Sequence, residues 1–468
     1  MEEKYTRLVE IFKELSSVPR NSKKEDKIGK YILEYAKNLG LEAYMDDLYN
    51  VVVRKEASVG MENKKKIIFQ AHTDMVCEKT KDSSHDFEND PIDIIINGDK
   101  MTANDTTLGA DDGIGVATLL LLMEEDILLP ETYFFFTTQE EIGMYGAKGL
   151  DTSKIEAEYL INLDGEEENT AIVGCAGGVS VHYNKEVELE KATEEIYKLE
   201  ISGLYGGHSG VDIDKNRINS NYLAAKILEG TNSKIFSFAG GNKDNAIPNS
   251  TTVIFENKNN IDEKISKILE NLEVSEEDKN IVVDLEKMEN ANCDALTIKD
   301  SNELIQLILN LKQNVIKMSE DVDGLVETSG NIGIVRTEEG KIHIVESLRS
   351  SIDSEKNRVK EINNSLANSL GYKTIEEGEY PGWKYNPNSI LEKVYRKSYI
   401  DTHNGEEPIV CAIHAGVECG MFYEKMPNLD MISLGPDVVD VHTVNETLYL
   451  ESCKKLLKTL YTMIENLK

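Results

Sequence analysis

The chain has 468 residues, 40% of them hydrophobic, and its 51 Lys and Arg against 85 Asp and Glu give a net charge of −34. This composition excludes collagen-like, mucin-like and disordered low-complexity proteins, because there is enough apolar material for packed cores, and at roughly 150 residues per domain it predicts two or three domains. The negative charge excludes nucleic acid as a partner, since binding to a phosphate backbone depends on an excess of Lys and Arg.

The first segment, MEEKYTRLVEIFKEL, has neither the basic start nor the long apolar run of a signal peptide, and it predicts an amphipathic helix. The longest apolar stretch, residues 116–123, is far shorter than the roughly 20 residues that a bilayer span requires. Six cysteines without a C-x-x-C pair predict reduced, mostly buried thiols. We therefore expect a cytoplasmic protein without a membrane segment.

Helices and strands are predicted to alternate over the first part of the chain. Ser22 is a candidate cap for a helix that ends at Gly40. Continuous apolar runs at residues 66–71, 132–138 and 159–163 are typical of strands buried on both faces, and residues 113–123 predict a helix. Strands separated by helices predict an α/β fold with a mostly parallel sheet flanked by helices.

From about residue 179 apolar and polar residues alternate, which is typical of strands with one solvated face. Helical segments at 218–228, 261–272, 303–311 and 355–370 lie among further strands at 233–239, 251–256 and 341–348. This mixture predicts an inserted α+β domain over residues 179–384. The buried-strand pattern returns at 429–434, before a last helix at 446–467, so residues 1–178 and 385–468 are predicted to form the two parts of one α/β domain.

Polar side chains follow the predicted buried strands at the points where the strands end. They are His72 and Asp74 after 66–71, Glu140 and Glu141 after 132–138, Asp164 after 159–163, and His442 after 429–434. Asp111 lies in the loop that leads into the helix at 113–123. Because ligands bind at the carboxyl ends of strands in an open α/β sheet, we expect these side chains to share one crevice.

Imidazoles and carboxylates without a thiolate are typical of a hydrolytic zinc or manganese site. Two neighbouring ions need a carboxylate that bridges them. We expect His72 and Asp164 to hold one ion, Glu141 and His442 to hold the other, and Asp111 to bridge. Asp74 is expected to accept the second N–H of the His72 imidazole and so to fix its tautomer.

Glu140 remains beside the predicted ions. It is a candidate general base that takes a proton from a metal-bridging water and passes it to a leaving amine. His208, in a turn-rich segment of the inserted domain, is a candidate donor to the oxyanion of the tetrahedral intermediate. A second domain that closes over the metal ions would also exclude water.

Single motifs of this kind carry little weight, because surface carboxylate pairs are common in a chain with 85 acidic residues. Asp112 and Glu446 are expected to be charges at helix N-termini, where the helix dipole favours carboxylates, and not ligands. The prediction of a metal site therefore depends on the convergence of five separate polar clusters in one crevice.

Seven blocks of the sequence resemble the signature blocks of aminoacyl-histidine dipeptidases (peptidase D), in the co-catalytic zinc metallopeptidase family that includes carnosinase and peptidase T. The blocks are HTDMVCEK at 72–79, TLGADDGIG at 107–115, TQEEIGMYGA at 138–147, NLDGEE at 162–167, GLYGGHSG at 203–210, AIHAGVECG at 412–420 and DVHTVNE at 440–446. They stand in family order and extend over essentially the whole chain.

The resemblance implies hydrolysis of Xaa-His (carnosine-like) and other unblocked dipeptides, with two divalent ions, Zn²⁺ first and Mn²⁺ or Co²⁺ as alternatives. It implies His72, Asp111, Glu141, Asp164 and His442 as ligands, Glu140 as the base and His208 as the donor from the lid. Residues 1–178 and 385–468 then form the zinc-peptidase catalytic domain, and residues 179–384 form an inserted α+β lid and dimerisation domain. The resemblance also implies a homodimer through the lid.

Residues that bind the substrate are less closely specified. Arg349 and Asn219 are candidates for the substrate carboxylate, for which Arg offers two parallel donors, and an ordinary surface charge is the alternative for Arg349. Glu418 is a candidate partner of the free amine, and the alternative is that His414 and Glu418 brace the wall of the site.

Two other functions are consistent with the same ligands. One is a metal-dependent amidohydrolase that removes an N-acyl group from an amino acid. The other is a non-catalytic metal-binding or peptide-binding protein, against which Glu140 argues, because a binding protein needs ligands but no base.

Overall fold

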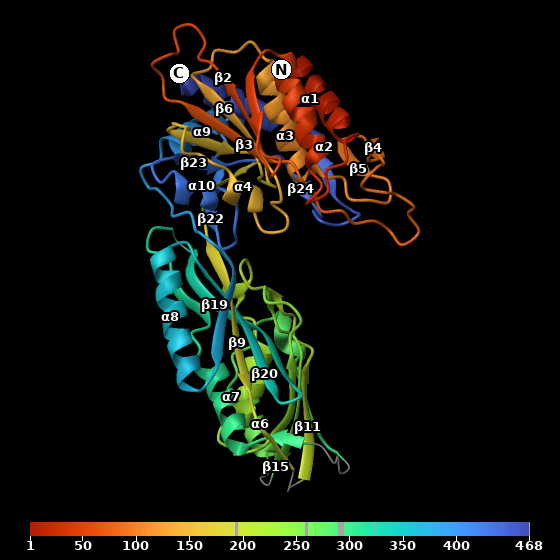
Figure 1. Cartoon of the computed structure of the whole chain (residues 1–468), viewed down its shortest axis with the longest axis vertical. Coiled ribbons are helices and arrows are strands. Elements are labelled where there is room, and N and C mark those ends of the chain that lie inside the picture. The colour runs from red at the N-terminus through yellow and green to blue at the C-terminus, as the bar shows by residue number, and fades with distance from the viewer. Residues whose placement is uncertain (192–194, 258–260, 289–293, 323, 468) are drawn as a thin grey trace. The chain divides into compact units, whose positions relative to one another are not determined.

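The computed structural model describes residues 1–191, 195–257, 261–288, 294–322 and 324–467. Within it the chain forms two compact units. Unit 1 comprises Met1–Cys175, Trp383–Ala412 and Val417–Lys468, and unit 2 comprises Ala176–Gly382 and Ile413–Gly416. The two ends of the chain therefore belong to the same unit, as the red and blue elements of Figure 1 illustrate.

The sheet of unit 1 has eight strands in the order β1-β2-β6-β3-β7-β23-β8-β22. The strands are β1 (Glu42–Met45), β2 (Val51–Lys55), β3 (Ile67–His72), β6 (Thr132–Thr137), β7 (Tyr159–Asn162), β8 (Thr170–Cys175), β22 (Ile409–Ile413) and β23 (Asp430–Ser433). The central strands β6, β3, β7 and β23 run parallel to their neighbours in this group. All residues of β3, β6 and β7 are buried, as their continuous apolar sequences predict.

Helices cover this sheet. They are α1 (Glu2–Leu15), α2 (Asp26–Asn38), α3 (Ala110–Glu124), α4 (Tyr145–Gly149), α9 (Ile390–Thr402), α10 (Cys419–Lys425) and α11 (Leu450–Asn466). The helix α3 is apolar on nearly all sides, because it packs between α1 and the strand β3. Figure 1 shows α1 beside α3. A smaller sheet in the order β24-β25-β5-β4 joins β24 (Val438–Val439), β25 (Thr447–Tyr449), β5 (Lys100–Ala103) and β4 (Ile94–Asn97).

Two predicted helix starts in unit 1 are wrong. The residue before α2 is Glu25, and Ser22 instead donates its hydroxyl to Asp74 Oδ2 at 2.7 Å. The last helix begins at Leu450 and not at residue 446, because residues 447–449 form the strand β25.

Unit 2 is built on an antiparallel sheet in the order β16-β11-β15-β13-β19-β20-β9-β21, with β18 paired to β19. The strands are β9 (Gly177–Glu186), β11 (Glu195–Ser202), β13 (Ile235–Gly240), β15 (Thr251–Asn257), β16 (Val282–Lys287), β18 (Asn314–Met318), β19 (Val326–Glu338), β20 (Lys341–Ser350) and β21 (Lys373–Tyr380). Two short pairs join β10 (Leu189–Lys191) to β17 (Asp294–Leu296) and β12 (Gly207–His208) to β14 (Ala246–Ile247).

The helices of unit 2 are α5 (Ser220–Leu228), α6 (Asp262–Glu270), α7 (Ile298–Asn310) and α8 (Asp353–Ser369), with short 3-10 turns at Ile213–Lys215 and Glu277–Asn280. Apolar residues of these helices and of the sheet share one buried core. The helix α7 begins five residues earlier than predicted, because the side chain of Thr297 accepts the N–H of Asp300 and caps it. The predicted fold class, an α/β sheet with parallel central strands and an inserted α+β domain, is confirmed.

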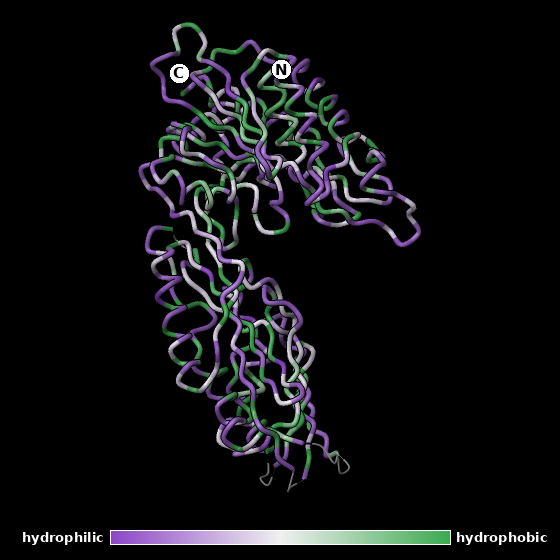
Figure 2. Tube along the Cα trace, in the orientation of Figure 1, coloured by the Kyte–Doolittle hydropathy of each residue, from purple (hydrophilic) through white to green (hydrophobic). Residues whose placement is uncertain are grey.

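Three further features of the structure are the hydropathy of the loops, the character of the helices and the burial of the thiols. In Figure 2 the loops at the edges of each unit are largely hydrophilic. Among the described residues, no helix combines the length and the apolar character that crossing a membrane would need. Of the five described cysteines, Cys175, Cys419 and Cys453 are buried, and Cys293 lies outside the described residues.

Candidate active site

The predicted ligands of unit 1 gather at one edge of its sheet. His72 ends β3, Glu140 and Glu141 follow β6, and Asp164 follows β7. Since β6, β3 and β7 are neighbours and run parallel, their carboxyl ends lie side by side. Asp111, from the first turn of α3, and His442, from the loop after β24, complete the cluster.

Asp111 lies between the two histidines. Its Oδ1 is 3.0 Å from His72 Nε2, and its Oδ2 is 3.0 Å from His442 Nε2. Asp164 Oδ1 approaches His72 Nε2 at 3.4 Å, and Glu141 Oε2 approaches His442 Nε2 at 3.0 Å. The cluster is therefore two groups of three ligand-type side chains that share one carboxylate, with the ligand atoms of each group within 4.8 Å of one another.

The donor set fits two divalent cations. Imidazole and carboxylate are the ligands of hydrolytic zinc and manganese sites, and a shared carboxylate is what neighbouring ions require. Glu141 Oε1 is buried without a hydrogen-bond partner, which is costly unless another group satisfies it. A third group of His72, Glu140 and Glu141 lies within the same limit of 4.8 Å, so Glu140 is beside the cluster as predicted.

The carboxylates of the cluster disfavour one another electrostatically. Burial and the charge of Asp164 raise the pKa of Glu140 well above its usual range. Burial also raises the pKa of Asp164 to about 6, and the charges of Asp111 and Glu141 act in the same direction. Divalent cations would neutralise this excess of negative charge, which is a second reason why the residues fit a metal centre.

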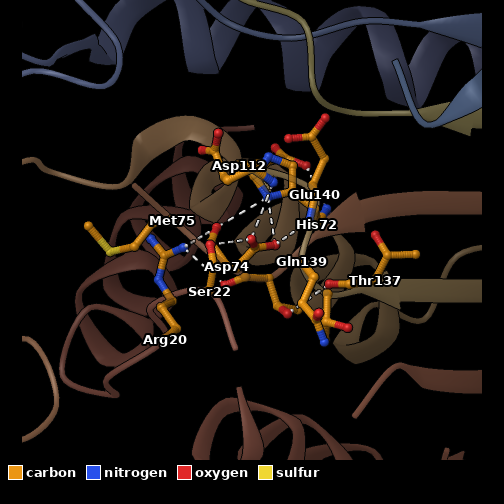
Figure 3. A network of polar contacts seen from close by, with 12 residues as sticks. Arg20, Ser22, His72, Asp74, Met75, Asp112, Thr137, Gln139 and Glu140 are labelled. Atoms are coloured by element: carbon orange, nitrogen blue, oxygen red, sulfur yellow. Dashed lines mark hydrogen bonds and ion pairs between the residues drawn. The ribbon is translucent and has the colours of Figure 1, made fainter. Parts of the chain in front are cut away.

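Asp74 organises the loops around His72. The Nδ1 atom of His72 is 3.1 Å from the backbone oxygen of Asp74 and 3.5 Å from its Oδ1, so the predicted contact with the imidazole is made mainly by the carbonyl. The carboxylate accepts the N–H of Glu140 at 3.0 Å and of Glu141 at 3.3 Å. In Figure 3 contacts converge on Asp74 from Ser22, His72 and the Glu140 segment. Asp74 thus connects the loop after β3 to the loop after β6.

Asp112 serves at the start of α3, as predicted. Its Oδ1 accepts the N–H of Gly115 at 3.2 Å, and its Oδ2 accepts the N–H of His72 at 3.1 Å. The peptide bond between Asp111 and Asp112 is cis, and both residues have non-helical backbone angles. The hydrogen bonds of these adjacent residues differ: the side chain of Asp111 faces the two histidine rings, and that of Asp112 accepts backbone N–H groups.

His208, the predicted oxyanion donor, lies in β12 of unit 2. Its Nδ1 accepts the N–H groups of Gly210 and Val211, each at 3.2 Å. A neutral imidazole that accepts at Nδ1 carries its proton on Nε2. Burial, and then the positive charge of Arg349, lower the pKa of His208, which favours this neutral donor form.

The predicted substrate residues of unit 2 have different surroundings. Arg349 is 8% exposed and donates to the Tyr380 hydroxyl at 2.8 Å. Asn219 caps α5 by accepting the N–H groups of Asn221 and Tyr222, and its amide donates to Asn331 Oδ1 at 3.2 Å. These bonds occupy the side chain of Asn219, so the structure gives it a structural task in place of a free donor for substrate.

Glu418 and His414 are buried side chains that hydrogen-bond to neighbouring residues, as expected of residues that brace the wall of a site. Glu418 is 0% exposed and accepts hydrogen bonds from Gln70 Nε2 and Thr137 Oγ1, each at 2.6 Å. Burial raises the pKa of its carboxyl to about 8. In unit 2, Nε2 of the buried His414 is 2.7 Å from Ser329 Oγ. Of the two interpretations that the sequence allows, these contacts favour bracing.

Buried charged residues that the sequence did not single out also hold the loops. Glu25, which is 0% exposed, accepts the N–H of Gln139 at 3.1 Å, next to the N–H groups that Asp74 accepts. Arg20 is 2% exposed and lies beside Asp74 in Figure 3. Neither residue belongs to a motif, and only the folded chain brings them to the site.

Comparison with known proteins identifies the family of this chain and similar solved structures. The family model described as peptidase family M20/M25/M40 matches residues 68–466. Cytosol non-specific dipeptidase from Escherichia coli (strain K12) is 37% identical over 459 residues, covering 95% of this chain and 94% of that protein. The crystal structure of aminoacylhistidine dipeptidase from Vibrio alginolyticus is similar with a TM-score of 0.92 and 33% identity, covering 98% of this chain and 96% of that one. An aminopeptidase from Bacillus cereus shares the fold, with a TM-score of 0.62 and 19% identity over 99% and 98% of the two chains.

Proposed function

Because the chain belongs to peptidase family M20/M25/M40, we propose that this dinuclear metallopeptidase hydrolyses dipeptides with a free N-terminus, including Xaa-His (carnosine-like) dipeptides. The observation that carries the proposal is the placement of Asp111, whose two oxygens face two different imidazoles at 3.0 Å each. The names of the relatives from Escherichia coli and Vibrio alginolyticus support the choice of dipeptides as substrates.

The two ions would be held by the two groups described above. His72, Asp111 and Asp164 would hold one, and Asp111, Glu141 and His442 the other. When bound, the ions supply Lewis acidity for the attack of water on the peptide carbonyl. We propose Zn²⁺ because the ligands are imidazoles and carboxylates, with Mn²⁺ and Co²⁺ as alternatives that the same ligands accept.

The side chains of the protein perform the proton transfers. Glu140, which is half-buried next to the cluster, takes a proton from the attacking water and returns it to the leaving amine. Asp74 keeps Glu140 and His72 in position through the hydrogen bonds of its carboxylate and carbonyl. His208, with its proton on Nε2, is our candidate donor to the oxyanion.

Arg349 is our candidate partner of the substrate carboxylate, since a guanidinium offers two parallel N–H donors to a carboxylate. It keeps part of this capacity, because its hydrogen bond within the described part of the chain uses Nη1, toward the Tyr380 hydroxyl, and leaves Nη2 for a substrate. We also propose a homodimer through unit 2 and a cytoplasmic location, and the name of the Escherichia coli relative supports the location.

A panel of four substrates tests the proposal against the alternative of an N-acyl amidohydrolase. Ala-His, β-Ala-His, Ala-Leu and N-acetyl-His differ in the amine and in the C-terminal residue. We expect hydrolysis of the unblocked dipeptides and none of N-acetyl-His. Preferential hydrolysis of N-acetyl-His would establish the amidohydrolase, and no hydrolysis of any of them by metal-loaded protein would establish a binding protein.

A further inference from the structure

The loop that carries the shared ligand Asp111 is held from one side by Glu446. The residue that precedes α3 is Gly109, which has no side chain to cap the helix. Glu446, which is 2% exposed, accepts instead the N–H groups of Leu108 and Gly109 with Oε2, and those of Ala110 and Asp111 with Oε1, at 2.7 to 3.2 Å. Four consecutive backbone donors are thus satisfied by one carboxylate that is more than 330 residues away in the sequence.

The same loop is held from the other side by Arg20. One guanidinium nitrogen donates to the carbonyl of Gly109. The other donates to the carbonyls of Thr73 at 3.2 Å and Asp74 at 3.4 Å. Figure 3 shows the Arg20 side chain reaching toward Asp74, with His72 beyond it. Arg20 therefore joins the loop of Asp111 to the loop that follows His72.

Two glycines make room for this guanidinium. A Cβ atom at Gly109 or at Gly113 would lie 2.5 Å from Arg20 Nη2, which is closer than non-bonded atoms approach. Gly109 also has a φ of +70°, a conformation that side chains disfavour. The two glycines of Gly-Ala-Asp-Asp-Gly thus leave a space that the Arg20 guanidinium occupies. Close packing against these glycines holds the side chain in addition to its hydrogen bonds.

We propose that Arg20 and Glu446 are positioning residues that set the position of the Asp111 carboxylate relative to His72. The two loops meet at Arg20, and the charge of Glu446 favours the buried guanidinium. Neither side chain reaches the ligand atoms of the cluster, so both act through the backbone. Removal of residues that orient metal ligands typically changes metal affinity or activity by about 10-fold to 100-fold. This inference rests on the proposed function, because it concerns the cations that Asp111 would share.

The test compares four variants with a matched control. Arg20→Met removes the donors, Arg20→Lys keeps the charge without the fork, Glu446→Gln keeps one carbonyl acceptor, and Gly113→Ala fills the slot while Arg20 remains. The control is Lys55→Met, because Lys55 donates to the carbonyls of Leu122, Met123 and Glu125 at the opposite end of α3, at 2.7 to 3.3 Å. Zn²⁺ affinity is measured by competition with a chelator, and the visible absorption of the Co²⁺-loaded protein reports the ligand geometry.

We expect Arg20→Met, Glu446→Gln and Gly113→Ala to bind Zn²⁺ about 10-fold to 100-fold more weakly and to change the Co²⁺ spectrum, with Arg20→Lys between them and the wild type. Lys55→Met is expected to lose thermal stability but to keep the affinity and the spectrum of the wild type. Where Arg20→Met does not fold, Arg20→Lys and Glu446→Gln decide the question.

Wild-type affinity and spectrum in the Arg20 and Glu446 variants would overturn the positioning role, as would an equal loss in Lys55→Met. Either result would leave the proposed function intact. A wild-type protein that binds no divalent cation would overturn both proposals.

Discussion

At the scale of single residues, the site shows why adjacent acidic residues are not interchangeable. Glu141 approaches His442 at 3.0 Å, whereas the backbone N–H of Glu140 is held by Asp74, and the carboxyl of this half-buried residue has a raised pKa. The shape of one loop therefore gives two adjacent glutamates different surroundings, which fit the proposed ligand for Glu141 and the proposed base for Glu140. Asp111 and Asp112 are divided in a comparable way, between the histidine rings and the backbone of α3.

Glu140→Gln tests the position of the base. The amide has nearly the same shape as the carboxyl but cannot accept the proton, so we expect turnover to fall by about 100-fold or more. The metal content should stay unchanged, because none of the ligand positions is altered. The measurement is steady-state hydrolysis of Ala-His together with elemental analysis of the same samples.

Glu156→Gln is the control, because the side chain of Glu156 is 92% exposed and lies outside the metal cluster. Turnover within a few-fold of wild type in Glu140→Gln would remove Glu140 from the role of base. A loss of metal in that variant would assign it to the ligands instead.

Sequence reasoning predicted which candidate ligands lie together, but not the residues that support them. The positions of His72 and Asp164 could be predicted because each follows a run of buried apolar residues, and the end of such a run lies at the edge of the sheet where ligands bind. No comparable rule places Arg20 or Glu446, whose contacts join residues that are 53 to 338 positions apart. For Ser22, the local capping pattern was misleading, because the Ser22 hydroxyl donates to the carboxylate of Asp74 and does not cap the helix.

At the scale of elements, a buried carboxyl connects a helix of unit 2 to the sheet. Glu346 on β20 is 0% exposed and accepts the hydroxyl of Tyr183 on β9 at 2.6 Å and the amide of Asn363 on α8 at 2.9 and 3.0 Å. Burial raises the pKa of Glu346 to about 7 from an ordinary value of 4.5, despite these hydrogen bonds. The packing of α8 against β9 and β20 therefore encloses an acid that favours its protonated form.

This raised pKa makes the stability of unit 2 dependent on pH. The folded state binds the proton more tightly than the unfolded state, so the contribution is fully present below pH 4.5 and is lost as the pH rises through about 7. The loss amounts to roughly 3 kcal/mol, since one pKa unit corresponds to about 1.4 kcal/mol.

We expect Glu346→Gln to remove most of this dependence between pH 5 and pH 8. The measurement is thermal unfolding followed by calorimetry at several pH values, and the wild type should lose more stability than the variant over that interval. Parallel pH profiles for the two proteins would show that Glu346 does not titrate in this range.

Element types were predicted better than element ends. Observed strands correspond to the apolar runs of β3, β6 and β7 and to the alternating pattern of β9 and β11. They could be predicted because burial on one or both faces of a strand determines the spacing of its apolar residues. The start of α7 depends on the hydrogen bond from Thr297, and the start of α11 depends on the pairing of β25 with β5. The periodicity of the sequence indicates neither contact. The ends of helices are therefore where tertiary structure adds most to the prediction.

At the scale of the whole molecule, the candidate metal ligands and the predicted donor belong to different units. All five predicted ligands, together with Glu140 and Asp74, belong to unit 1, and His208 and Arg349 belong to unit 2. The family resemblance inferred from the sequence blocks is confirmed by the family match, which extends from residue 68 to residue 466 and so includes both units. The roles of the unit 2 residues stay predictions.

The same division predicts how removal of metal changes stability. Cations that bind only the folded form stabilise it by mass action, by about 4 kcal/mol when their free concentration is 1,000 times the dissociation constant. The predicted ligands come from five places in unit 1, on β3, on α3 and in the loops after β6, β7 and β24. Chelation should therefore loosen that unit and leave the sheet of unit 2 unchanged.

Hydrogen exchange followed by mass spectrometry resolves the two units in the intact chain. After treatment with a chelator, we expect faster exchange in peptides from β3, from the loop after β6 and from the first turn of α3, where His72, Glu141 and Asp111 lie. Peptides from β9 and β20 in unit 2 serve as the internal control, since they carry none of the predicted ligands. Adding back Zn²⁺ should restore slow exchange in unit 1. An equal change in both units, or none in unit 1, would contradict the assignment of the cations to this cluster, because a ligand protects the amides of the structure that must be folded for it to bind.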